Sequence, residues 1–145
     1  MNRPRSILAF ERLFLLSLLL WALRQALTWN AQVAQFEANP AGQGRAWILA
    51  VLLGATALVN LGIWYLAARR ASRIGKWLAV AAAVVSGVLV LFEVMALLQP
   101  GGTAMPFKLL ALVASVLTVA AAVPLFREDA ALWFGEDVSL AEEDA

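Results

Sequence analysis

The sequence predicts an all-α integral membrane protein, a bundle of four transmembrane helices with both termini in the cytoplasm. Of its 145 residues, 63% are hydrophobic, against about 45–50% in soluble domains, and the mean hydropathy is +0.80. The chain contains four segments of about 20 mainly apolar residues, the length that a helix needs to cross the hydrocarbon core. Basic residues are concentrated in alternate flanking segments, which gives the bundle its expected orientation.

The four helices are expected at about residues 7–29, 46–67, 77–98 and 106–126, which together form a membrane domain over residues 1–126. The first helix is expected to project beyond the membrane, because no helix breaker occurs before Asn39 and Pro40. Pro124 is expected to kink or end the fourth helix. The basic and apolar start resembles a secretory signal, but the apolar run continues through Trp29 without a small-residue cleavage site, so we expect an uncleaved helix.

Lys and Arg residues in short loops set the expected orientation. Two segments are basic: the N-terminal flank, and the loop after the second helix, which contains Arg69, Arg70, Arg73 and Lys76. The other two loops offer only Arg45 and Lys108. The positive-inside rule therefore places both termini in the cytoplasm. The four basic loop residues are also suited to binding anionic lipid headgroups, although topology alone explains them more economically.

Residues 127–145 form an expected acidic cytoplasmic tail with seven acidic residues and one Arg. Two interpretations are open. In the first, the tail is solvated and partly disordered, and its segment "ALWF" rests at the membrane interface. In the second, the tail docks onto the basic loop or onto a basic partner.

Two ionisable residues lie deep in predicted spans, where charges are costly and usually face a partner or a cavity. Arg24 and Glu93 each lie 16 residues beyond the inner end of a helix that starts in the cytoplasm, or roughly 24 Å at 1.5 Å per residue. The sequence therefore predicts an intramembrane ion pair between Arg24 and Glu93, assisted by Gln25. The alternative is that Arg24 extends to the outer headgroups. Glu11 and Arg12 are expected to form a pair at the inner boundary.

Smaller polar residues within the spans are typical of interhelical contacts. They are Thr56 and Asn60 on the second helix, Ser86 on the third, and Ser115 and Thr118 on the fourth. Small residues also recur at helical spacing, as at Ala50, Gly54 and Gly62 on the second helix. Such stripes allow helices to approach closely, either within one bundle or between copies.

The composition excludes several kinds of active site. The chain has no Cys and no His, which removes thiolate and imidazole chemistry. It also lacks a glycine-rich phosphate loop and a nucleophile elbow. We therefore expect no catalytic residue, metal site, cofactor or nucleic-acid partner.

The opening segment "RPRSILAFERLFLLSL" and the closing segment "LFREDAALWF" resemble the ends of small, uncharacterised four-helix inner-membrane proteins of bacteria. The resemblance implies the fold and the bacterial inner membrane, but no activity. In size the chain also resembles the small multidrug-resistance exporters. Their essential glutamate belongs to the first helix, whereas the deep acid of this chain, Glu93, is on the third.

The expected function follows from these features. The sequence favours a structural or accessory membrane subunit, or a self-associating protein, whose partners are the lipid bilayer and other subunits or further copies of the chain. The alternative is an oligomeric small transporter or channel in which Glu93 binds a cation or a proton.

Overall fold

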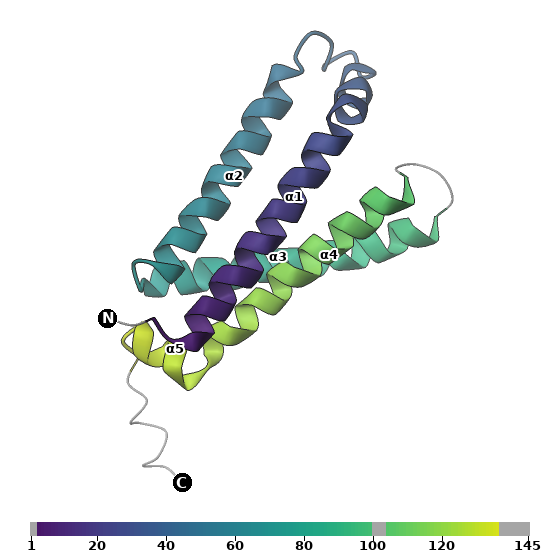
Figure 1. Ribbon diagram of the computed structural model, residues 1–145. Coiled ribbons are helices and arrows are strands. Elements are labelled where there is room, and N and C mark those ends of the chain that lie inside the picture. The colour runs from purple at the N-terminus through teal and green to yellow at the C-terminus, as the bar shows by residue number, and fades with distance from the viewer. Residues whose placement is uncertain (1–2, 100–103, 137–145) are drawn as a thin grey trace.

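A computed structural model describes residues 3–99 and 104–136, and all regular secondary structure in these residues is helical. Four helices are long and apolar enough to cross a membrane, as expected of a multi-pass membrane protein. The elements, labelled in Figure 1, are α1 (Arg5–Glu37), α2 (Trp47–Ala68), α3 (Arg73–Leu98), α4 (Met105–Ala122), the 3-10 helix η1 (Val123–Phe126) and α5 (Glu128–Trp133).

The helix boundaries follow local chemistry. α1 continues to Glu37, as the absence of a breaker predicts, and its 33 residues span about 50 Å. α3 begins four residues earlier than expected because the Ser72 hydroxyl accepts a hydrogen bond from the Gly75 backbone N–H (3.4 Å) and caps the helix. α4 changes to η1 at Val123, directly before Pro124, which confirms that this proline ends the fourth long helix.

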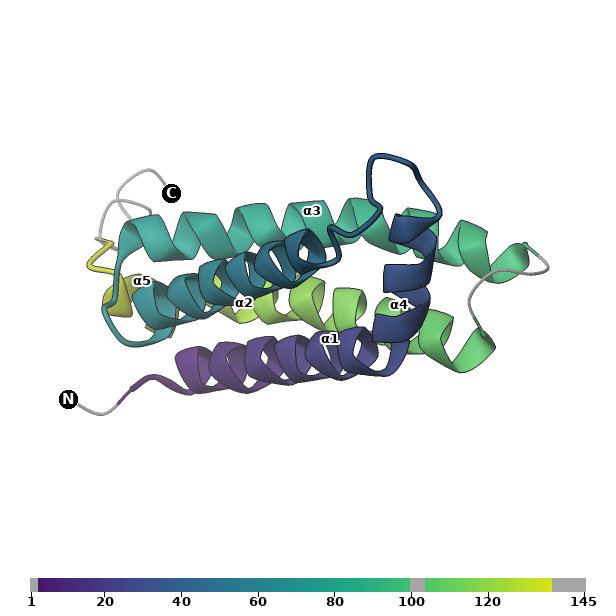
Figure 2. The same cartoon turned by 90° about the horizontal axis from the view of Figure 1, so that it is seen from above.

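The last turns of α1 bend away from its first part, as the dark blue segment in Figure 2 shows. Near this bend the Thr28 hydroxyl donates to the Arg24 carbonyl (2.8 Å) and accepts from the Gln32 amide (2.7 Å). A Thr hydroxyl bonded to the carbonyl four residues earlier often bends a helix. This bond favours a bend in α1, which the spacing of apolar residues did not predict.

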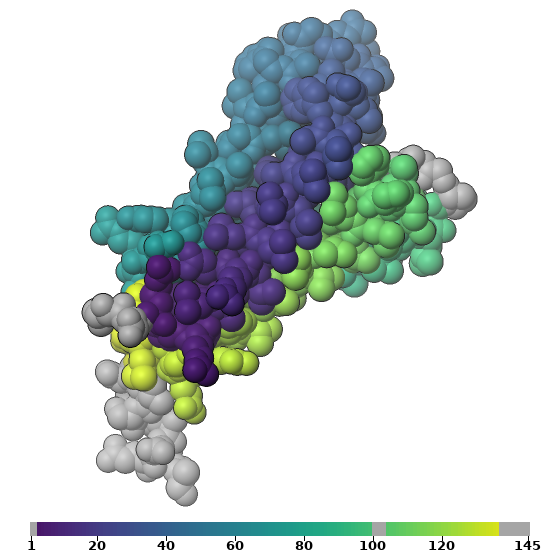
Figure 3. Space-filling view, viewed as in Figure 1, coloured from purple at the N-terminus to yellow at the C-terminus, as the bar shows by residue number. Residues whose placement is uncertain are grey.

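The apolar core lies at one end of the molecule. Its largest members are Phe10, Phe14 and Phe134, all nearly or fully buried. We call this end, formed by residues 3–14, 63–79 and 121–136, the closed end. The opposite end, which carries residues 38–46 and the start of α4, is the open end. Figures 1 and 3 show the α1–α2 arm and the α3–α4 arm spreading apart toward the open end.

The spread leaves most of α2 only loosely packed against the rest of its chain. α4 packs extensively on α1 and on α3, whereas α2 makes fewer contacts with either neighbour. None of residues 47–62 is buried, and Leu58 is 72% exposed. α2 is therefore held mainly by its last turns, at the closed end.

Candidate functional site

The closed end is held by residues 127–136, which we call the C-terminal clasp. This clasp forms a hydrogen bond or an ion pair with each of three long helices. The Ser6 N–H at the start of α1 donates to Asp129 Oδ2 (3.1 Å), and the Trp133 indole N–H donates to the Ala67 carbonyl of α2 (3.3 Å). The Lys76 ammonium of α3 donates to both carboxylate oxygens of Glu136 (2.8 and 2.7 Å). The clasp thus ties together the ends of α1, α2 and α3.

Lys76 is the most deeply buried charge of the clasp contacts, with 4% of its surface exposed. Its ammonium lies 5.3 Å from the centre of the Phe126 ring and 5.6 Å from that of Phe134, within the range of cation–π attraction. The Arg73 guanidinium donates to the carbonyls of Phe134 (3.2 Å) and Gly135. These contacts agree with the docking interpretation of the tail for residues 127–136, and residues 137–145 lie outside the described part.

Asp129 supplies a cap that α1 lacks, since Pro4 at the N-cap position contributes no side-chain hydrogen bond. A carboxylate at a helix N-terminus is stabilised by the helix dipole and the free N–H groups. The bond from the Ser6 backbone N–H lowers the pKa of the Asp129 carboxyl below its ordinary value of 3.8. The clasp and α1 are therefore coupled through a titratable group.

This coupling predicts acid sensitivity. A carboxyl group whose pKa is lower in the folded state than in the unfolded state stabilises the fold at pH values above its unfolded pKa. This stabilisation is lost as the pH falls through the pKa of the folded state. We expect the melting temperature of the wild-type chain to decrease below about pH 4 more steeply than that of Asp129→Asn, measured by circular dichroism in detergent. Equal pH dependence of the two proteins would show that Asp129 does not cause the acid sensitivity.

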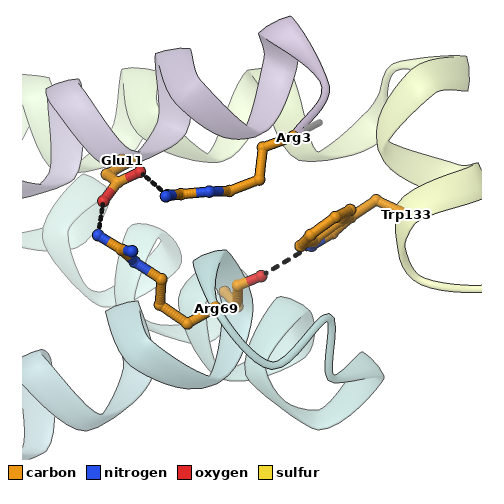
Figure 4. A network of polar contacts seen from close by, with 5 residues as sticks. Arg3, Glu11, Arg69 and Trp133 are labelled. Atoms are coloured by element: carbon orange, nitrogen blue, oxygen red, sulfur yellow. Dashed lines mark hydrogen bonds and ion pairs between the residues drawn. The ribbon is translucent and has the colours of Figure 1, made fainter. Parts of the chain in front are cut away.

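Glu11 is the centre of a second network at the closed end (Figure 4). Its carboxylate pairs with Arg3 (2.7 Å) and with Arg69 (3.1 Å). The expected boundary pair with Arg12 is wrong, because adjacent residues of a helix point in different directions. Arg69 also lies 5.4 Å from the centre of the Trp64 ring. The basic loop is thus engaged by its own chain at Arg69, Arg73 and Lys76, and its roles in topology and lipid binding stay predictions.

A cavity of about 320 Å³ lies among the four long helices, and we call it the polar groove. Its lining includes Val59 of α2 and Val85 of α3, which are 62% and 60% exposed, so the groove is open between these two helices. Its polar lining comprises Ser17, Thr56, Asn60, Ser86, Ser115 and Thr118. The structure therefore brings together all five small polar residues that the sequence singled out, and adds Ser17.

The hydrogen bonds of these residues differ from the expected interhelical pattern. Thr56 donates to the Leu52 carbonyl and Asn60 to the Thr56 carbonyl, each at 2.8 Å within α2. Thr118 donates to the Ala114 carbonyl (3.1 Å) within α4. Because the helices spread apart, these groups bond to their own backbone, as Ser and Thr do when a carbonyl four residues earlier is in reach.

Ser115 makes the one described interhelical hydrogen bond of this set, and its acceptor is Glu93 Oε1 (3.0 Å). The second oxygen of Glu93 is buried, and so is Nε of Arg24, and neither has a hydrogen-bond partner among the described residues. The ion pairs within 4 Å in residues 3–99 and 104–136 do not include Arg24 with Glu93. Their direct pair stays a prediction.

The sequence did not predict the contact between Glu93 and Ser115. It identified Ser115 only as one of the small polar residues within the spans. Arg24 instead lines a separate cavity of about 640 Å³ beside the bend of α1. Gln25, which was expected to assist the pair, accepts a hydrogen bond from the Gln32 amide (3.0 Å) and lines the same cavity. Counting residues along straight helices places the two charges at the same depth, but it takes no account of the bend in α1.

Comparison with known proteins finds no matching family model, no similar curated protein and no similar solved structure. The fold by itself defines the class, an all-helical chain with four helices suited to crossing a membrane.

Proposed function

We propose that the chain is a multi-pass protein of the bacterial inner membrane, with both termini in the cytoplasm, that acts through its helix surfaces. In this proposal it is an accessory subunit or a self-associating protein, and α2 is the helix that docks onto another transmembrane helix. The C-terminal clasp fixes one end of the bundle, and the exposed length of α2 is available to a partner.

The observation that carries the proposal is the small-residue face of α2. At Gly54 and Gly62, nothing in the described part of the chain lies within 4 Å of the position that a Cβ would take, apart from the neighbouring helix backbone. Leu58 lies between them at helical spacing and is 72% exposed. Transmembrane helices associate through small residues that let backbones approach. In this structure the stripe has room for such an approach and no helix of its own chain in it.

Association through this face is tested by filling it. We expect Ala50→Ile, on the small-residue face of α2, to reduce Förster transfer between differently labelled copies in liposomes by more than about half, because one bulky residue separates the backbones. The matched control is Ala22→Ile, at an exposed position of α1. If the purified protein shows no transfer, the same pair is compared for recovery of a cross-linked complex from native membranes. Equal effects of the two variants would contradict docking by α2.

A second candidate is supported by Glu93, whose unpartnered buried oxygen lies next to Ser115 at the polar groove. Intramembrane carboxylates in such surroundings often carry protons or cations. If this function is correct, liposomes containing the wild-type chain will dissipate a pH gradient and those containing Glu93→Gln will not. Equal leakage from both preparations would exclude the candidate.

A further inference from the structure

The cavity that contains Arg24 has the features of a binding site. It lies between the bend of α1 and the start of α4, where Ala104 and Phe107 form one wall, and we call it the α1–α4 pocket. Five polar side chains line it: Arg24, Gln25, Thr28, Gln32 and Gln35. No acidic side chain is among its described lining residues. The pocket is therefore polar and basic, although it begins at the depth of a predicted span.

The side chains of this pocket include hydrogen-bond donors that suit an acceptor on a ligand. The Arg24 guanidinium donates no hydrogen bond to any residue in the described part of the chain, and its Nε is buried. The Gln32 amide donates to the carbonyl oxygen of Gln25 (3.0 Å). This bond consumes the acceptor of Gln25 and leaves its NH₂ group as a donor. A guanidinium beside a carboxamide NH₂ group suits an anionic oxygen, above all one that accepts two parallel bonds from Arg.

The depth of the pocket limits the kinds of ligand that it can bind. Arg24 lies 16 residues beyond Leu8, near the expected inner boundary of the first span, or about 24 Å along a helix. The hydrocarbon core is about 30 Å thick, so Arg24 lies in the part of the core nearest the open end, and its long side chain reaches the headgroup level there. Gln35 lies further out, and Leu27 and Phe107 supply apolar walls beside the polar groups. This order of polar and apolar surfaces matches a phospholipid with its phosphate at Arg24.

We propose that the α1–α4 pocket binds the phosphate group of a phospholipid from the leaflet at the open end. Arg24 donates two hydrogen bonds to the phosphate, and the amide of Gln25 donates to a remaining oxygen. Gln35, further out, donates to the polar headgroup beyond the phosphate. The acyl chains follow the apolar surface beside Leu27 and Phe107. Glu93 is not among the lining residues of this pocket, so its neutralisation should not weaken binding. This site is independent of docking by α2.

The test is a titration of the detergent-solubilised full chain with phosphatidylglycerol, with the retained lipid counted by native mass spectrometry. We expect Arg24→Gln to weaken the first lipid adduct at least about tenfold, as the loss of a charged hydrogen-bond donor predicts. The matched control is Arg45→Gln, which removes the same charge from an exposed loop residue. We expect this variant to bind within about twofold of the wild-type chain, and Glu93→Gln to bind at least as tightly.

Several outcomes would overturn the proposal. Equal weakening by Arg24→Gln and Arg45→Gln would mean that only total charge matters. Displacement of the lipid by soluble glycerol phosphate at similar concentration would assign the pocket to free phosphate esters instead of lipid. If Arg24→Gln fails to fold, Gln35→Ala at the exposed rim decides the question. Unchanged lipid retention in that variant would contradict the site, and a loss of about threefold would support it.

Discussion

Replacing Glu136 with Gln is expected to lower the free energy of unfolding by about 3 kcal/mol, because it leaves the Lys76 ammonium buried without a counter-charge. Lys76 is 4% exposed, and both described hydrogen bonds of its ammonium go to Glu136. The nearby rings of Phe126 and Phe134 offset only a small part of this loss. The measurement is chemical unfolding in detergent, followed by tryptophan fluorescence.

The control is the double variant Lys76→Met with Glu136→Gln. Replacing both partners of a buried ion pair with groups of similar shape is often nearly neutral. We therefore expect the double variant to recover most of the stability that Glu136→Gln loses. Additive losses in the two single variants would show that the pair does not couple the clasp to α3.

Replacing Phe10 with Ala is expected to cost about 3–5 kcal/mol, the usual range for removing a buried aromatic ring. Phe10 is fully buried at the closed end, and its ring centre lies 5.3 Å from that of Phe14. The cavity would open where the clasp packs against α1, so the same unfolding measurement should detect it.

Leu19 provides the comparison in the same helix, because it is 63% exposed. Leu19→Ala removes a large apolar side chain from an exposed position and is expected to change stability by less than about 1 kcal/mol. A loss for Leu19→Ala as large as that for Phe10→Ala would mean that the core does not lie at the closed end.

The helical architecture was predictable because it depends on local properties of the chain. The length of each apolar run, Pro124 and the absence of a breaker before Asn39 determined the helix ends to within a few residues. The largest difference is at the start of α3, which Ser72 caps four residues earlier than expected. The five small polar residues were also identified, because polar groups stand out in apolar spans. The structure then placed them around one groove.

The tertiary contacts of the charged residues were less accessible from the sequence. Composition described residues 127–145 as acidic, but it could not show that Glu136 pairs with Lys76 or that Asp129 caps α1. Depth counting likewise gave Arg24 and Glu93 the same level. The bond from Ser115 to Glu93 depends on how helices pack, which residue spacing does not specify.

Buried side chains, ion pairs and the C-terminal clasp concentrate at the closed end. The small-residue face of α2, the polar groove and the α1–α4 pocket lie along the rest of the molecule. In our proposal, the closed end supplies stability and these surfaces supply recognition. Variants of the clasp should therefore change unfolding more than association, and variants of α2 should do the reverse.

Site-directed photo-cross-linking in native membranes tests docking by α2 most directly. The chain has no Cys, so a single introduced thiol carries a benzophenone at one chosen position. We predict that the probe at Leu58→Cys gives one discrete adduct, with the mass of a second copy or of one partner protein. The probe at Leu19→Cys, at a similarly exposed position of α1, should give none. No adduct from position 58, or the same adducts from both positions, would contradict docking by α2.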